Sequence, residues 1–150
     1  MAGYYPKSKS DKWATPKALY DTLNAEFNFN FDPCPINWAP GDPDGLSIEW
    51  GERSFVNPPY SKVANWIEKA HNEWKKGKLV VLLINAITDT KAFHKFINGQ
   101  AEIRFIRGRV KFEQPGHTAA PNVKPSILAI FRPSQNTAEI STLPVDAPEA

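Results

Sequence analysis

A continuous apolar run, Leu79–Ile84, constrains the fold of this chain more than any other segment. Six apolar residues without a polar break are typical of a strand that is buried on both faces. Such strands occur in the centre of sheets that helices cover on both sides. The run therefore predicts a central strand of an α/β fold.

Two segments around this run have the period of amphipathic helices. The first helix is expected to have Thr15 as its N-cap and Pro16 at its first position. The second is expected to be capped by Ser61 and to end at Gly77. Their apolar residues recur on one face and are Leu19, Leu23 and Phe27 in the first helix, and Val63, Trp66, Ile67, Ala70 and Trp74 in the second.

Shorter apolar segments have the pattern of strands. Strands are expected at 27–31, 45–50, 54–56, 102–107, 109–112 and 126–131. Ile103 and Phe105 are the expected core residues of the strand at 102–107, with Ile106 as a further candidate. A short helix, capped by Thr88 or Asp89, is expected before that strand. The alternation of strands and helices predicts an α/β fold with a largely parallel sheet.

The length of 150 residues predicts one domain, at 13–132. Residues 1–12 are expected to be a flexible arm, and 133–150, which lack periodicity, a disordered tail. The net charge of +2 argues against a strongly basic nucleic-acid binder, so any basic surface must be local. The single cysteine, Cys34, permits no internal disulfide, and no stretch approaches the roughly 18 apolar residues of a membrane span. A cytoplasmic protein is expected.

The tetrapeptide Asn57-Pro58-Pro59-Tyr60 follows one expected strand and carries the clearest chemical signal. It resembles the active-site signature of S-adenosylmethionine-dependent amino-methyltransferases, which implies an exocyclic amine as the substrate. The lone pair of an exocyclic amine such as adenine N6 is delocalised into the ring, which makes the amine a poor nucleophile. The side-chain oxygen of Asn57 and the carbonyl of Pro58, held stiffly by the Pro-Pro step, are two acceptors for its protons. Tyr60 offers a face on which a flipped base can stack. The alternative interpretation is an ordinary turn after an edge strand.

Two further polar signals, Asp32-Pro33-Cys34 and Asp44-Gly45-Leu46, are expected near the carboxyl ends of strands, where α/β sheets bind ligands. The chain has no Gly-x-Gly-x-x-Gly dinucleotide motif and no phosphate-binding lysine loop. It also has no paired His and Cys cluster that would indicate zinc, and no metal is expected.

The order of these motifs, preceded by Trp13-x-Thr15-Pro16, resembles that of adenine-N6 DNA methyltransferases, in particular the small phage-type, Dam-like family. The resemblance covers about residues 11–132. It implies a compact, Rossmann-like methyltransferase sheet with flanking helices. It also implies methyl transfer from S-adenosylmethionine to a flipped adenine in double-stranded DNA, with no metal.

The same resemblance implies roles for the cofactor-binding residues. Thr15 and Pro16, with the neighbouring Trp13, would contact the methionine end of S-adenosylmethionine. Asp32 would bind its ammonium group, while Pro33 and Cys34 shape the loop. Asp44 would accept a hydrogen bond from the cofactor adenine, and Leu46 would pack on that ring. The glycine-rich cofactor loop of larger methyltransferases is replaced by residues 35–40, and their ribose-binding acidic residue has no clear counterpart.

Arg109, Lys111 and Phe112 are the candidate DNA-binding residues. The two cations are expected to hold phosphates, and Phe112 to stack opposite Tyr60. The loop at 113–124 is long enough to enter a groove, and a homodimer would suit a palindromic site. Three alternatives stay open: a methyltransferase acting on an RNA base, one acting on a protein glutamine, or a non-catalytic nucleic-acid-binding relative. The recognition sequence and the biological role, protection from nucleases or regulation, also stay open.

Overall fold

The computed structural model describes residues 13–114, 117–121, 124–133 and 139–144. The expected arm at 1–12 lies outside these residues, as do the parts of the expected tail at 134–138 and 145–150. Within the described part of the chain, no helix is both long and apolar enough to cross a membrane.

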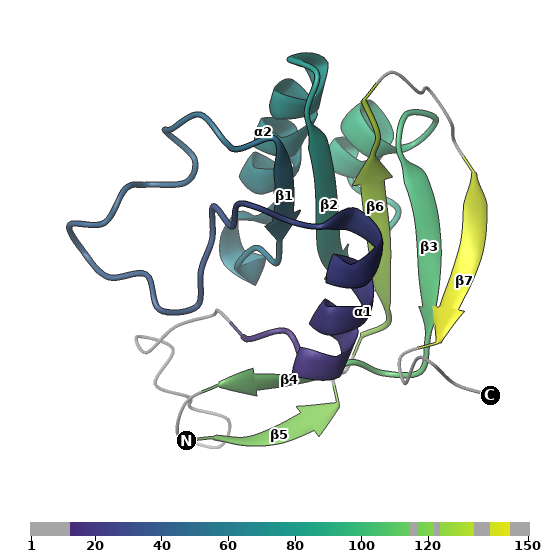
Figure 1. Cartoon of the computed structure of the whole chain (residues 1–150). Coiled ribbons are helices and arrows are strands. Elements are labelled where there is room, and N and C mark those ends of the chain that lie inside the picture. Colours follow the sequence, from purple (N-terminus) through teal and green to yellow (C-terminus); the bar gives the residue numbers. More distant parts are fainter. Residues whose placement is uncertain (1–12, 115–116, 122–123, 134–138, 145–150) are drawn as a thin grey trace.

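The core of the fold is a five-stranded sheet in the order β1-β2-β6-β3-β7 (Figure 1). Its strands are β1 (Arg53–Val56), β2 (Leu79–Asn85), β3 (Glu102–Arg107), β6 (Ser126–Phe131) and β7 (Ile140–Pro144). β1 pairs with β2 in parallel and β3 with β7 in parallel, whereas β6 lies antiparallel between β2 and β3. The predicted α/β class is confirmed, but the sheet is mixed because β6 opposes the other strands.

β2 is the predicted central strand, and its side chains divide between two cores. Val80, Leu82 and Ile84 face one apolar cluster, and Val81 and Leu83 face the other. Burial on both faces accounts for the unbroken apolar run, since neither side of the strand contacts water.

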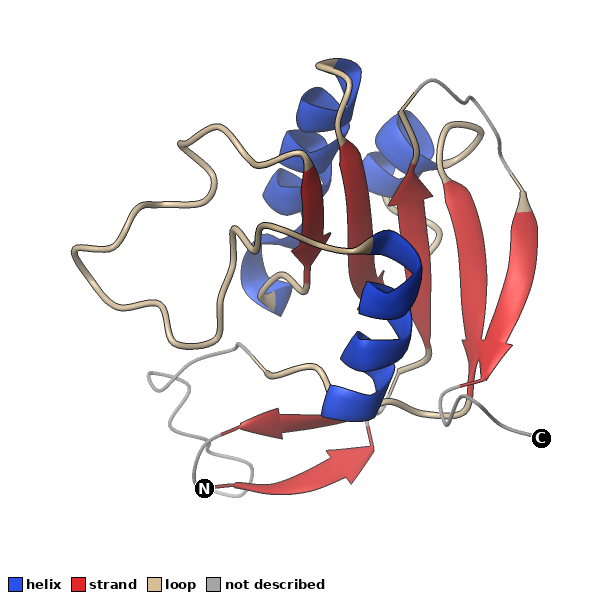
Figure 2. Ribbon diagram, in the orientation of Figure 1, coloured by secondary structure: helices blue, strands red, loops and turns tan. Residues whose placement is uncertain are grey.

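Helices cover both faces of the sheet (Figure 2). α1 (Lys17–Phe27) packs its stripe of Leu19, Leu23 and Phe27 against one face. α2 (Val63–Lys75) and the short π-helical turn η2 (Phe93–Ile97) contribute to the core cluster on the other face. The apolar stripes of α1 and α2 are therefore confirmed.

The predicted helix caps are wrong in detail. Pro16, and not Thr15, stands at the N-cap of α1, without a side-chain cap. Ser61 lies inside a 3₁₀ turn, η1 (Tyr60–Lys62), that precedes α2. The hydroxyl of Thr90 accepts a hydrogen bond from the backbone N–H of Phe93, so the short helix is capped there and not at Thr88 or Asp89. Gly77, at φ +99°, does follow α2 as expected.

Two expected strands are not regular strands. α1 continues to Phe27 and ends at Asn28 in the left-handed conformation, so in 27–31 only Phe31 forms a bridge, to Ser54 of β1. Segment 45–50 contains no strand. Its backbone instead folds around Trp50, whose indole N–H donates to the carbonyl of Gly45 at 2.7 Å.

Three further expectations are corrected at the carboxyl side of the chain. Phe105 is 44% exposed. It pairs with the edge strand β7, and the apolar cluster that covers this face of the sheet includes Ile103 but does not extend to Phe105. Residues 109–124 do not form one strand and a loop, since β4 (Lys111–Gln114) and β5 (His117–Pro121) make a separate antiparallel hairpin. β7 lies in the expected disordered tail, where pairing along β3 orders a segment that has no strong pattern of its own.

A buried ion cluster anchors segment 45–50 to the sheet. The ammonium group of Lys78 contacts Glu73 at 2.6 Å, Glu49 at 3.1 Å and the carbonyl of Trp50 at 2.6 Å. The other carboxylate oxygen of Glu73 accepts from Lys69 at 3.0 Å and from Lys76, the residue that follows α2, at 3.1 Å. The cluster therefore joins α2, β2 and the long loop before β1.

Candidate active site

The carboxyl ends of β1 and β2 lie side by side and point toward the β4–β5 hairpin (Figure 1). Val56, the last residue of β1, is in register with Leu82 of β2. Asn57 therefore leaves the sheet beside the last residues of β2, and the two prolines that follow are buried. The tetrapeptide thus leads from the end of β1 into the turn η1, of which Tyr60 is the first residue.

Asn57 lines two cavities at once. The first has a volume of about 260 Å³, and the second about 300 Å³. No other residue lines both of them among the residues described. A single side chain thus borders two separate spaces, which is the arrangement that a group-transfer reaction between two bound molecules requires.

The carboxamide of Asn57 has a defined orientation. Its nitrogen donates to the backbone carbonyl of Trp13 at 2.5 Å and to the hydroxyl of Thr15 at 3.2 Å. A carbonyl oxygen only accepts hydrogen bonds, so the NH₂ group must be the end that faces Trp13. The side-chain oxygen is consequently directed away from this segment.

The first cavity combines a carboxylate with aromatic rings. Trp13, Ala14, Thr15, Tyr20, Asp32, Cys34, Ile36, Phe55 and Asn57 line it. One oxygen of Asp32 accepts a hydrogen bond from the backbone N–H of Cys34 at 2.9 Å, which shapes the turn after Phe31. A carboxylate and aromatic faces both attract positively charged groups, so the cavity suits a cationic ligand.

Tyr20 is a polar group of this cavity that the sequence analysis missed. Its ring packs on Phe55 and Phe29, with centroids 5.3 and 5.8 Å apart. Burial, and then the charges of Asp32 and Asp21, raise the pKa of its hydroxyl. Tyr20 therefore remains a neutral phenol that can donate a hydrogen bond into the cavity.

Half of the predicted cofactor-binding residues line the first cavity. Trp13, Thr15, Asp32 and Cys34 all line the first cavity, whereas Pro16, Pro33, Asp44 and Leu46 do not. Both carboxylate oxygens of Asp44 accept hydrogen bonds within their own turn, from the N–H of Leu46 and the hydroxyl of Ser47.

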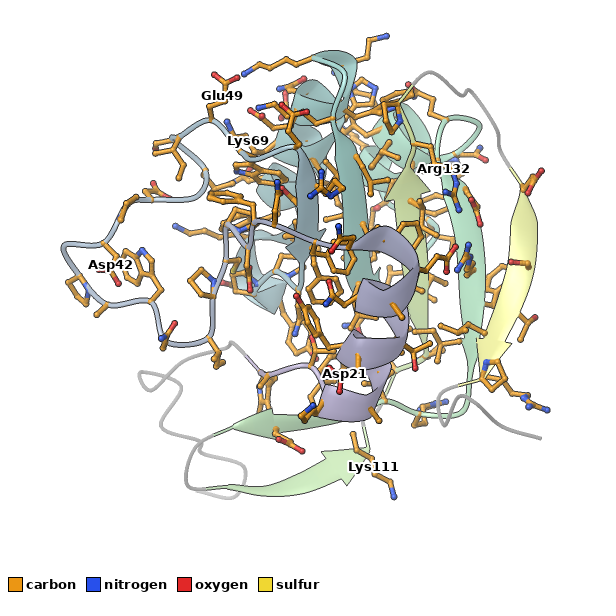
Figure 3. All side chains as sticks on the ribbon, in the orientation of Figure 1. Asp21, Asp42, Glu49, Lys69, Lys111 and Arg132 are labelled. Carbon is orange, nitrogen blue, oxygen red and sulfur yellow. The ribbon has the colours of Figure 1, made fainter. Side chains whose placement is uncertain are left out.

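The turn that contains Asp44 nevertheless lies against Pro33. A β-carbon at Gly45 would fall 2.0 Å from the Pro33 carbonyl oxygen, so only glycine permits this contact. The two cofactor motifs predicted at 32–34 and 44–46 are therefore neighbours at the base of a loop that extends far from the sheet, with Asp42 near its outer end (Figure 3).

The second cavity is more apolar and contains the predicted base-stacking pair. Asn57, Pro58, Tyr60, Val63, Leu83, Ile84, Asn85, Ile87, Phe112 and Lys124 line it. Tyr60 is 42% exposed and Phe112 is buried, so the pair presents one accessible ring and one fixed ring. Asn85 and Lys124 supply polar groups that were not predicted from the sequence. The signal for Asn85 was its place directly after the central apolar run.

The predicted DNA-binding cations lie on or beside the hairpin and line neither cavity. Arg109 is exposed before β4, and Lys111 is exposed at its first residue. The side chain of Lys111 points away from the body of the protein (Figure 3). No group of three His, Cys, Asp or Glu side chains suited to a metal ion occurs among the described residues.

Comparison with known proteins yields a family. The model of the family described as DNA N-6-adenine-methyltransferase (Dam) matches residues 3–148. The DNA N-6-adenine-methyltransferase of Haemophilus phage HP1 (strain HP1c1) is 30% identical over 141 residues, which cover 85% of this chain and 82% of the phage protein. A crystal structure described as a predicted O-methyltransferase from Agrobacterium tumefaciens is 24% identical with a TM-score of 0.36, and covers 67% of this chain but only 44% of its own.

Proposed function

Since the chain belongs to the DNA N-6-adenine-methyltransferase family, it is an adenine-specific DNA methyltransferase, and we propose that it takes the methyl group from S-adenosylmethionine and receives its adenine flipped out of duplex DNA. The observation that carries this proposal is the place of Asn57 between two cavities. The first cavity is the proposed cofactor site and the second the proposed site of the target base.

The residues of the first cavity fit S-adenosylmethionine by charge. The cofactor carries a sulfonium and an ammonium group, and the cavity offers the Asp32 carboxylate with the rings of Trp13 and Tyr20. Its volume of about 260 Å³ is close to the lower end of ligand cavities, which run from roughly 300 Å³. We assign the cavity to the methionine end. Ile36 borders it from the long loop, and that loop is the proposed support for the adenosine end.

The second cavity fits a planar base. Tyr60 and Phe112 line it together, so a flipped adenine can stack on aromatic rings. Stacking of this kind is worth about 1–3 kcal/mol per base. The apolar side chains of Val63 and Ile84 complete the lining and exclude water from the reacting amine.

The proposed chemistry is one of positioning. S-adenosylmethionine supplies an electrophilic methyl group on sulfur. The side-chain oxygen of Asn57 and the carbonyl of Pro58 accept hydrogen bonds from the two N6 protons, which draws the nitrogen toward a tetrahedral geometry and directs its lone pair at the methyl carbon. The carbon–sulfur bond would break as the carbon–nitrogen bond forms, leaving a neutral thioether, and the positive charge on N6 would be relieved when the methylated base leaves the cavity and loses one proton to solvent.

The DNA backbone is assigned to the hairpin side of the molecule. Arg109 and Lys111 are exposed there, and Lys124 lines the base cavity. With a net charge of only +2, phosphate contacts depend on such local cations. A homodimer would present two such surfaces to a palindromic site. A DNA substrate is also consistent with a location in the cytoplasm, which would be that of the host cell if a phage encodes the protein.

The test is methyl transfer to three substrates by the full chain. Radiolabelled S-adenosylmethionine is supplied with plasmid DNA free of N6-methyladenine, with total RNA, or with protein, and the products are identified by mass spectrometry. N6-methyladenine in DNA is the expected product. Label in RNA or in glutamine would overturn the substrate assignment. The absence of both transfer and calorimetric cofactor binding would instead indicate a non-catalytic relative.

A further inference from the structure

The segment Trp13–Thr15 contacts three functional parts of the molecule. It supplies both hydrogen-bond partners of the Asn57 carboxamide nitrogen, at 2.5 and 3.2 Å. All three of its residues line the first cavity. Its middle residue, Ala14, also exchanges two backbone hydrogen bonds with Glu113 of β4, at 2.5 and 3.0 Å.

These contacts determine which end of the Asn57 side chain can meet the target amine. Rotating the carboxamide by half a turn would place its oxygen against the Trp13 carbonyl, and two acceptors would then face each other without a proton. The two hydrogen bonds therefore select the rotamer in which the oxygen is directed away from Trp13 and Thr15. Without them, the carboxamide that carries the proposed hydrogen-bond acceptor would sample both orientations.

The hairpin holds the segment in place. The paired bonds between Ala14 and Glu113 form an isolated antiparallel bridge that fixes the segment to β4. Glu113 follows Phe112, whose buried ring lines the base cavity. The backbone that positions Phe112 thus also positions the carbonyl to which Asn57 donates.

We propose that Thr15 is a positioning residue for the methyl-transfer step: its hydroxyl and the Trp13 carbonyl, held to β4 through Ala14, orient the Asn57 carboxamide so that its oxygen accepts a hydrogen bond from the target amine. The proposal rests on the proposed function of Asn57. It is separate from the expected contact of Thr15 with the cofactor, because the hydroxyl can accept from Asn57 and still donate its own proton elsewhere.

The experiment compares Thr15→Val, which removes the hydroxyl at nearly constant volume, with Thr15→Ser, which retains it. At saturating cofactor, Thr15→Val is expected to lower kcat about tenfold, the effect of losing one hydrogen bond to the carboxamide. Thr15→Ser is expected to remain within about twofold of the wild type. Thr22→Val is the matched control, because the Thr22 hydroxyl donates only to the Ala18 carbonyl within α1.

A double-mutant cycle isolates the coupling to Asn57. In the Asn57→Ala background, Thr15→Val should have little further effect on kcat, since there is no carboxamide left to orient. Equal effects in both backgrounds would overturn the proposal. A weaker cofactor affinity with unchanged kcat would also overturn it, and would leave Thr15 as a cofactor contact alone.

A readout without catalysis uses the side-chain amide signals of Asn57 in ¹⁵N-labelled protein, assigned by their loss in Asn57→Ala. Thr15→Val should shift these signals and speed exchange of the amide protons, and Thr15→Ser should not. Unchanged signals would contradict the proposal. If Asn57→Ala itself methylates DNA at the wild-type rate, the acceptor role proposed for Asn57 fails; if only the Thr15 results fail, the positioning role alone is lost.

Discussion

The ammonium nitrogen of Lys78 lies 2.6 Å from a carboxylate oxygen of Glu73, and both side chains are buried. Burial alone would raise the pKa of Glu73. Hydrogen bonds from Lys78 and Lys69 and from the backbone N–H of Trp50 outweigh this effect and lower the pKa to about 2. This ion pair ties α2 to β2 at the end of the sheet opposite the two cavities.

Acid should weaken the fold through this pair. Because the pKa of Glu73 is lower in the folded than in the unfolded chain, its contribution is complete above about pH 4.5 and is lost as the pH falls toward 2, to the extent of about 3 kcal/mol. Glu73→Gln should lower the melting temperature at pH 7, and its difference from the wild type should shrink by roughly half at pH 3 and further toward pH 2. Glu68→Gln, on the exposed face of the same helix, is the control, and a gap that is independent of pH would contradict the assignment.

Asn57→Ala should abolish most activity without preventing cofactor binding. The variant lacks the side-chain acceptor but leaves both prolines in place, so kcat should fall on the order of 10²-fold, as for the loss of a transition-state hydrogen bond. Asn57→Asp should be no better, because a carboxylate has no proton to donate to the Trp13 carbonyl at 2.5 Å. The measurement is N6-methyladenine formation at saturating cofactor. Substantial activity in Asn57→Asp would show that the NH₂ group of the Asn57 side chain is dispensable.

Tyr60 should act through its ring and not through its hydroxyl. Tyr60→Phe and Tyr60→Trp are expected to retain most activity, since stacking requires only an aromatic face. Tyr60→Ala should raise KM for DNA about tenfold, in line with the lower part of the stacking range. Steady-state kinetics on plasmid DNA measure this. Equal losses in the Phe and Ala variants would assign the function to the hydroxyl instead.

Asp32→Asn should weaken binding of S-adenosylmethionine by tenfold or more. The amide oxygen of the variant still accepts from the Cys34 N–H, so the turn is kept while the charge is removed. Asp42→Asn, near the outer end of the same loop, should bind normally. Calorimetry gives both affinities, and the wild-type melting temperature should rise with cofactor by mass action. Comparable affinities for the two variants would remove Asp32 from the site.

Arg109→Ala with Lys111→Ala should weaken DNA binding and leave cofactor affinity unchanged. Loss of two phosphate contacts should reduce the slope of log K against log salt by nearly two. Lys75→Ala, in the last turn of α2, removes a charge far from the hairpin and serves as the control. The readout is a salt titration of DNA affinity by fluorescence anisotropy. A parallel loss of cofactor affinity would mean that these residues are structural.

The parts of the fold that were predictable are those whose signal is local. The helix period of α1 and α2 and the apolar run of β2 each lie within one segment, and the order of motifs identified the family that the comparison confirms. The strand β7 and the antiparallel place of β6 depend on pairing between distant segments, which no local pattern encodes.

The candidate site follows the same division. Thr15, Asp32 and Asn57 were predictable because each stands in a motif next to an element boundary, and they do line one cavity. Tyr20 lies within a helix, where its sequence context is that of any partly buried residue, and only the packing of α1 on Phe55 directs it into the cavity. Lys124 is brought to the base cavity by the connection between β5 and β6, beyond the reach of a local argument.

The position of β6 also has a consequence for synthesis on the ribosome. Its partners, β2 and β3, are complete about twenty residues before β6 emerges, yet β6 separates them in the finished sheet, bonded to both. Until then β2 presents a row of unsatisfied backbone groups on one side, and β3 has no strand beside it, because β7 follows β6 in the chain. The nascent chain therefore cannot form its hydrophobic core step by step from the N-terminus during synthesis. Folding must wait for its last quarter, and a chain cut short before residue 126 should be captured by chaperones or proteases instead of persisting as a smaller stable domain.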